Sequence, residues 1–120
     1  MKYTRHYEKK QAIMRELRNY KGNKILLQHY KKMISSHDNN HLKCNIEQCK
    51  RDIVRVRGNM NYVCDLLHYL PETDRELMLD VFVREDLTKQ EILEKYKITV
   101  AMLHYHADRC VSTLATMEFI

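Results

Sequence analysis

Glycine and proline are nearly absent from this chain of 120 residues, which contains two glycines and one proline. β-Sandwiches and β-barrels need such residues at frequent turns, so their scarcity disfavours an all-β fold. The chain is instead rich in Leu, Lys, Glu, Met, Gln and Arg, which favour helices. Apolar residues also recur every three to four positions. The sequence therefore predicts an all-α protein, built as one domain or as two very small domains that share a core.

Long apolar segments are absent as well. No apolar run approaches the roughly 18 residues that a transmembrane helix needs. The first residues, MKYTRHYEKK, lack the apolar stretch of a secretory signal. The four cysteines could form disulfides in a secreted chain, but without an export signal reduced thiols are expected. We therefore predict a cytoplasmic protein that has no membrane partner.

The charge is distributed unevenly along the chain. Residues 1–68 contain 15 Lys and Arg against 6 Asp and Glu, a net charge of +9, whereas residues 69–120 contain 6 against 10, a net charge of −4. A basic segment of this kind is a candidate for binding nucleic acid or an acidic partner. The predicted organisation is a basic helical region over residues 1–68 and a second domain over residues 69–120.

The basic region has three predicted helices. The apolar spacing predicts a helix over about residues 3–21, which Gly22 and Asn23 would end, and a second over about residues 24–34. SSHDNN, residues 35–40, is the clearest predicted loop. A third helix begins near His41, and Gly58 either kinks or breaks it. This third helix carries a seam spaced like a coiled coil, which would face a helix of this chain or of a second copy: Leu42, Ile46, Cys49, Ile53 and Val56.

The second domain has clear helix boundaries. Pro71 suits a helix start, and the apolar pattern then predicts a helix over about residues 72–83. Thr88 and Glu91 form the pattern of a capping box for a short helix that ends near Tyr96. Thr99 is the predicted cap of a last helix over about residues 100–116. The two last helices thus have the spacing of a helix-turn-helix.

The segment LPETDRELMLDVFVREDLTKQEILEKYKITVAMLHYHADRC resembles the promoter-binding helix-turn-helix at the C-terminal end of bacterial sigma factors. Leu87-Thr88 and Glu91-Ile92 match the start of the first helix of that motif, and Ile98-Thr99 matches the turn exit. The chain is particularly similar to the ArpU-type (autolysin regulatory protein-like) late transcription regulators of Gram-positive phages and prophages. The resemblance covers about residues 69–116.

The sequence departs from this pattern in two places. Lys97 occupies the turn position where the family has Gly, and a left-handed backbone is costly there without Gly. A longer or differently shaped turn is therefore expected. The second departure is the recognition helix, which has no strong guanine-reading side chain near its start. Asp108, one of its outward residues by the family pattern, should be repelled by phosphate unless it points away or accepts from a cytosine.

The resemblance implies a phage or prophage-encoded regulator that binds promoter DNA and contacts RNA polymerase. The last helix would lie in the major groove, and backbone N–H groups at a helix start would bind phosphate. The basic helices would add electrostatic attraction, and the seam could pair two copies into a homodimer. The residues expected to contact double-stranded DNA are Thr88, Lys89, Thr99, Val100, Ala101, His104, Tyr105 and Arg109.

Other chemistry finds little support in the sequence. The two histidines and two cysteines of HDNNHLKCNIEQC (His37, His41, Cys44, Cys49) match no common structural zinc spacing, so no metal is expected. His104 and His106 have no carboxylate or nucleophile at an informative spacing, and there is no Gly-rich phosphate loop. We expect no cofactor and no enzymatic activity.

Two alternatives remain open at this point. The chain could be a small phage-encoded interaction protein that binds and modulates a host protein through a scaffold derived from a helix-turn-helix. It could also be a DNA-packaging subunit built on such a motif. The poor recognition helix favours the interaction protein, whereas the intact caps and turn favour the regulator.

Overall fold

The computed structural model of the chain describes residues 2–35 and 43–117. Within these two ranges the fold is entirely helical and contains no strand, as predicted. The helices are α1 (Lys2–Ser35), α2 (Lys43–Leu67), α3 (Glu72–Phe82), α4 (Lys89–Tyr96) and α5 (Val100–Thr116). The predicted loop over residues 35–40 falls almost wholly outside the described residues. None of these helices has both the length and the apolar character that a membrane span requires.

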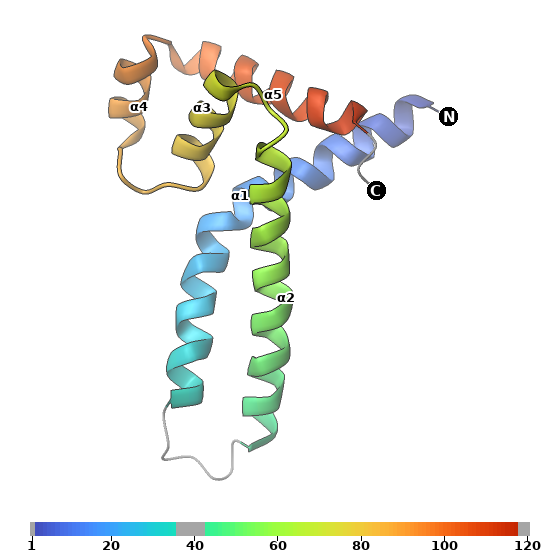
Figure 1. Cartoon of the computed structure of the whole chain (residues 1–120), viewed down its shortest axis with the longest axis vertical. Coiled ribbons are helices and arrows are strands. Elements are labelled where there is room, and N and C mark those ends of the chain that lie inside the picture. The colour runs from blue at the N-terminus through green and yellow to red at the C-terminus, as the bar shows by residue number, and fades with distance from the viewer. Residues whose placement is uncertain (1, 36–42, 118–120) are drawn as a thin grey trace.

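The helices form a long arm and a compact head (Figure 1). The C-terminal half of α1 lies side by side with α2 and makes the arm. The head contains α3, α4 and α5, and the N-terminal half of α1 packs along α5. Both predicted segments, residues 1–68 and 69–120, therefore contribute to one packed structure.

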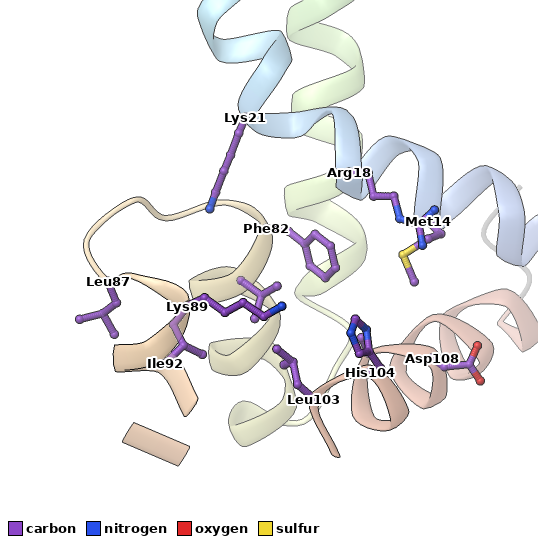
Figure 2. A pocket seen from close by; sticks show the side chains of 12 residues that line it. Met14, Arg18, Lys21, Phe82, Leu87, Lys89, Ile92, Leu103, His104 and Asp108 are labelled. Carbon is purple, nitrogen blue, oxygen red and sulfur yellow. The ribbon is translucent and has the colours of Figure 1, made fainter. Parts of the chain in front are cut away.

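The predicted helix end at Gly22 is wrong, because α1 continues through Gly22 and Asn23 to Ser35. Gly22 does not adopt a positive φ, so it does not act as a C-terminal cap. The helix bends there instead, and Lys21 lies at the corner (Figure 2). Glycine is a frequent site of helix bends. Packing of both halves of α1 against other helices stabilises the helical conformation that glycine and asparagine disfavour.

The third predicted helix is unbroken, since α2 runs through Gly58 to Leu67. In its seam, Cys49 and Val56 are buried while Ile46 and Ile53 are half-buried. Leu42 lies outside the described residues. Of the two partners that the sequence left open, the structure places α1 of the same chain beside α2. A second copy would therefore have to pair through a different surface.

Two apolar clusters hold the head together. The larger cluster joins α1, α2, α3 and α5, with Leu17, Leu67, Met78 and Leu114 among its fully buried members. The smaller cluster consists of one buried residue from each of α3, α4 and α5: Leu77, Ile92 and Leu103. The α5 positions predicted to face inward, Leu103, Ala107 and Cys110, are all buried. Together the clusters fix α4 and α5 relative to each other and to α1.

Candidate nucleic-acid interface

Both helices of the candidate motif begin with the caps that the sequence predicts. Glu91 N donates to Thr88 Oγ1 at 3.2 Å, and Thr88 N donates to Glu91 Oε1 at 3.0 Å, which completes a capping box at α4. These hydrogen bonds lower the pKa of the Glu91 carboxyl, with the backbone N–H of Thr88 as the main cause. At α5, Met102 N donates to Thr99 Oγ1 at 3.2 Å. Each threonine oxygen accepts one bond and keeps its hydroxyl proton as a donor.

The turn between α4 and α5 is short, contrary to the expectation from Lys97. Lys97 adopts the left-handed conformation itself, with φ 55° and ψ 49°. Its N–H donates to Glu94 O at 3.3 Å, and Ile98 N donates to Leu93 O at 3.1 Å. This pair of bonds is the Schellman pattern that commonly ends a helix. The bonds and the packing of Ile98 on the smaller cluster offset a backbone cost of roughly 1–2 kcal/mol for a residue with a Cβ.

A buried carboxylate, which the sequence did not single out, fixes α4 against α3. Asp80 is only 4% exposed and accepts from Lys95 Nζ at 2.8 Å, from Tyr96 Oη at 2.6 Å and from Arg84 Nη1 at 3.3 Å. Arg84 also donates to Glu76. Burial by itself raises the pKa of Asp80, but the three donors outweigh burial and lower it overall. The network is ionised at neutral pH and sets the orientation of the first helix of the motif.

One flank of α5 is turned toward α1. Asp108 Oδ1 accepts from Lys10 Nζ at 2.9 Å, and farther along the helix His6 Nε2 and Ser112 Oγ lie 3.2 Å apart. The carboxylate that the sequence identified as a source of repulsion for phosphate is therefore paired with a cation of α1. His104 is exposed on the same flank.

The neighbouring stripe of α5 is open to solvent. Ala101, Tyr105 and Arg109 follow one another at intervals of four residues and are all exposed, Tyr105 by 65%. Val100 is also exposed, at 42%. Arg109 Nη2 lies 3.7 Å from Oδ1 of the half-buried Asp74. The Arg109 side chain is itself 52% exposed and the distance is long, so its guanidinium can exchange this partner for another anion.

A cleft of about 540 Å³ separates α1 from α4 and α5 (Figure 2). Its walls are largely apolar, with Phe82, Ile92 and Leu103 among them. Three cations line it from two sides: Arg18 and Lys21 from α1, and Lys89 from α4. Lys21 extends from the bend of α1 toward α4, and Lys89 extends from α4 toward Phe82 and His104. The sequence predicted Lys89 but not its two neighbours.

The eight residues predicted to contact DNA fall into three groups in the structure. The threonine hydroxyls cap the two helices, Lys89 and His104 line the cleft, and the other four are exposed on α5. The missed residues, Arg18 and Lys21, belong to the basic excess of residues 1–68. They come to the cleft through the packing of α1 on the head of the molecule, and no local sequence pattern indicates that approach.

The histidines and cysteines that were considered for zinc, and from which no metal site was expected, lie mostly outside the described residues. His37 and His41 are not described, the side chain of Cys44 is not described, and Cys49 is buried beside α1. Among the side chains that are described, no group of three His, Cys, Asp or Glu residues is placed to hold a metal ion.

Comparison of the chain with family models, with curated proteins and with solved structures finds no match.

Proposed function

We propose that this chain is a cytoplasmic, phage or prophage-encoded transcription regulator that binds double-stranded DNA through α4 and α5. The observation that carries the proposal is the exposed stripe of Ala101, Tyr105 and Arg109 on α5. This helix is capped, follows a three-residue turn and is held by the two apolar clusters, while the buried Asp80 network fixes its partner helix α4. A rigid helix with one open face is the form in which a helix-turn-helix enters the major groove. The resemblance to sigma-type domains supports the same conclusion.

The side chains of this stripe can make a small number of contacts with DNA bases. Arg109 can donate to guanine or phosphate, Tyr105 can hydrogen-bond to a base edge or phosphate, and Val100 and Ala101 can pack on a thymine methyl. Phosphates would be bound by Lys89 and by the backbone N–H groups at the start of α4. Pairing of Asp108 with Lys10 reduces the repulsion that the Asp108 carboxylate would exert on phosphate.

Basic residues outside the motif would supply much of the affinity. Arg18 and Lys21 line the cleft from α1, across from the flank of α5 that carries His104. Each phosphate that a cation neutralises releases counterions, so affinity depends strongly on salt. A contact with RNA polymerase and a pairing of two copies on adjacent half-sites are further parts of the proposal, and a pairing surface would have to differ from the α2 seam.

The proposal is tested by selection from a pool of random duplex DNA at about 50 and 200 mM salt, the range over which phosphate contacts weaken measurably. The wild-type chain should enrich a preferred sequence and should lose affinity steeply at the higher salt. Tyr105→Ala/Arg109→Ala should lower the preference for that sequence by about tenfold or more, since one good base contact contributes about 1–3 kcal/mol.

The matched control is Tyr7→Ala/Arg51→Ala, which makes the same chemical changes at exposed positions of α1 and α2. This control should keep the sequence preference. Equal loss in both double variants would indicate non-specific attraction by the basic helices. A folded wild-type chain that binds no duplex at the lower salt would refute the proposal.

One observation favours a second candidate function, a protein-interaction module that modulates a host protein. Val100, Met102 and Tyr105 are all exposed, by 42%, 44% and 65%, near the start of one helix. Exposed aromatic and apolar side chains in one place are typical of protein interfaces. If the folded chain binds no DNA, crosslinking through a photoreactive residue at position 102 should capture one discrete partner, and Tyr105→Ala should abolish that capture.

A further inference from the structure

We propose that the cleft between α1 and the α4–α5 pair is a binding site for a small amphipathic anion, a molecule with an alkyl or aromatic body and one carboxylate head. The proposal does not rest on DNA binding. A cleft of about 540 Å³ falls within the range of small-molecule sites, which are typically 300–1,000 Å³ and mostly apolar with a few polar groups.

The walls of the cleft provide the apolar part of the site. Ile92 and Leu103 are buried residues of the smaller cluster, and the half-buried Phe82 and Met14 are also part of the lining. These side chains come from α1, α3, α4 and α5, so the cleft is enclosed by several elements rather than being a flat patch (Figure 2). An apolar body placed here would remove apolar surface of the protein and of the ligand from water.

The cations around the cleft provide the charge. Arg18, Lys21 and Lys89 make no ion pair or side-chain hydrogen bond with any described residue. The one carboxylate in the lining, Asp108, is already paired with Lys10 at 2.9 Å. The cleft therefore presents unpaired positive charge next to an apolar floor. That combination matches an anionic head on an apolar body and disfavours a cation or an uncharged polar ligand.

The test uses decanoate, kept below its micelle-forming concentration, with titration calorimetry and methyl NMR of the methionines. Decanoate should bind with one-to-one stoichiometry and should shift the methyl signal of Met14, which lines the cleft. The methyl of Met33, half-buried at the far end of α1, is the internal control and should not move. Decanol, which has the same body without the charge, and acetate, which has the charge without the body, should both bind at least about tenfold more weakly.

Two sets of variants separate charge at the cleft from charge elsewhere. Arg18→Glu/Lys21→Glu should weaken decanoate binding by at least about tenfold, since charge-assisted hydrogen bonds are lost. Lys31→Glu/Lys32→Glu makes the same charge change at exposed positions on the same helix and should leave the affinity within about twofold. Lys89→Gln changes an exposed residue on the other side of the cleft, and it should also lower the affinity for decanoate. This variant provides the test if Arg18→Glu/Lys21→Glu does not fold.

The proposal is overturned if decanoate does not bind, if Met14 stays unshifted, or if Met33 shifts equally. Equal affinity for decanol would also overturn the proposal, because the cations would then contribute nothing to binding. Equal affinity for acetate would overturn it as well, because the site would then bind any small anion without using its apolar walls. If the chain binds no DNA in the selection experiment, the decanoate affinities and methyl shifts can still be measured. Failure of the regulator proposal and failure of the ligand proposal are therefore distinguishable.

Discussion

Replacement of Asp80 by Asn should destabilise the whole head of the molecule. The substitution keeps the shape of the side chain but removes the negative charge of the carboxylate. That carboxylate accepts hydrogen bonds from Lys95 at 2.8 Å, from Tyr96 at 2.6 Å and from Arg84 at 3.3 Å. Removing one partner of a fully buried ion pair costs about 3–5 kcal/mol. Lys95 and Arg84 are 49% and 38% exposed, so water can solvate them again. We therefore expect a loss of about 2–3 kcal/mol in the free energy of unfolding.

Urea denaturation followed by circular dichroism measures this loss, with an unchanged dependence on urea concentration showing that the denatured state is unaltered. Asp52→Asn is the matched control. Asp52 is half-buried on α2, and it accepts from Gln48 at 3.1 Å and lies 3.7 Å from Arg55. The control should cost less than about 1 kcal/mol. Equal destabilisation by the two variants would refute the structural role assigned to Asp80.

The same variant should change how stability depends on pH. The pKa of Asp80 is lower in the folded state than in the unfolded chain, because the hydrogen bonds outweigh burial. Its contribution is therefore present above the unfolded pKa, about 4, and is lost as pH falls through the lower folded pKa. The gap in unfolding free energy between the wild-type chain and Asp80→Asn should stay constant from about pH 5 to 7 and narrow below about pH 4. A gap that widens on acidification would contradict this.

Three further predictions concern the same helices. Lys97→Gly should raise the unfolding free energy by about 1 kcal/mol in urea denaturation, because glycine adopts the left-handed turn without a Cβ cost; a loss of stability would show that the lysine side chain itself stabilises the turn. Thr88→Ala should lower the unfolding free energy by about 1 kcal/mol in urea denaturation. Thr88→Ser keeps the capping oxygen and should have a smaller effect. Cys110 should resist thiol labelling at pH 8 in the native chain and react in urea, since it is 1% exposed and burial raises the pKa of its thiol to about 11.

Helix boundaries set by neighbouring residues were predictable from the sequence. The capping box of Thr88 and Glu91 and the cap of Thr99 were predicted correctly, and α3 ends within one residue of its predicted end. The caps depend on hydrogen bonds between residues three apart, and the end of α3 on bonds between residues four or five apart, so a short stretch of sequence contains the information that these features need.

Features that depend on distant packing were not predictable. Gly22 and Asn23 have the local signature of a helix end, but the neighbours of α1 hold them in a helix. Lys97 has a side chain that disfavours the left-handed turn, yet the packing of Ile98 against the smaller apolar cluster, which includes residues of α3 and α5, stabilises that turn. The cleft is a further example, because its cations Arg18 and Lys21 lie far in sequence from the α4 and α5 residues opposite them.

The packing of α1 on α5 also has a consequence for the order in which the molecule assembles. His6 and Ser112 meet across 106 residues of chain, and Val111, Leu114 and Ala115 are buried in the same cluster as Ile13 and Leu17. During synthesis the start of α1 must therefore wait for almost the whole chain before its partner exists. A fragment limited to residues 69–120 would expose the apolar side of α5 to water. We therefore expect such a fragment to aggregate, whereas the chain that contains α1 stays monodisperse.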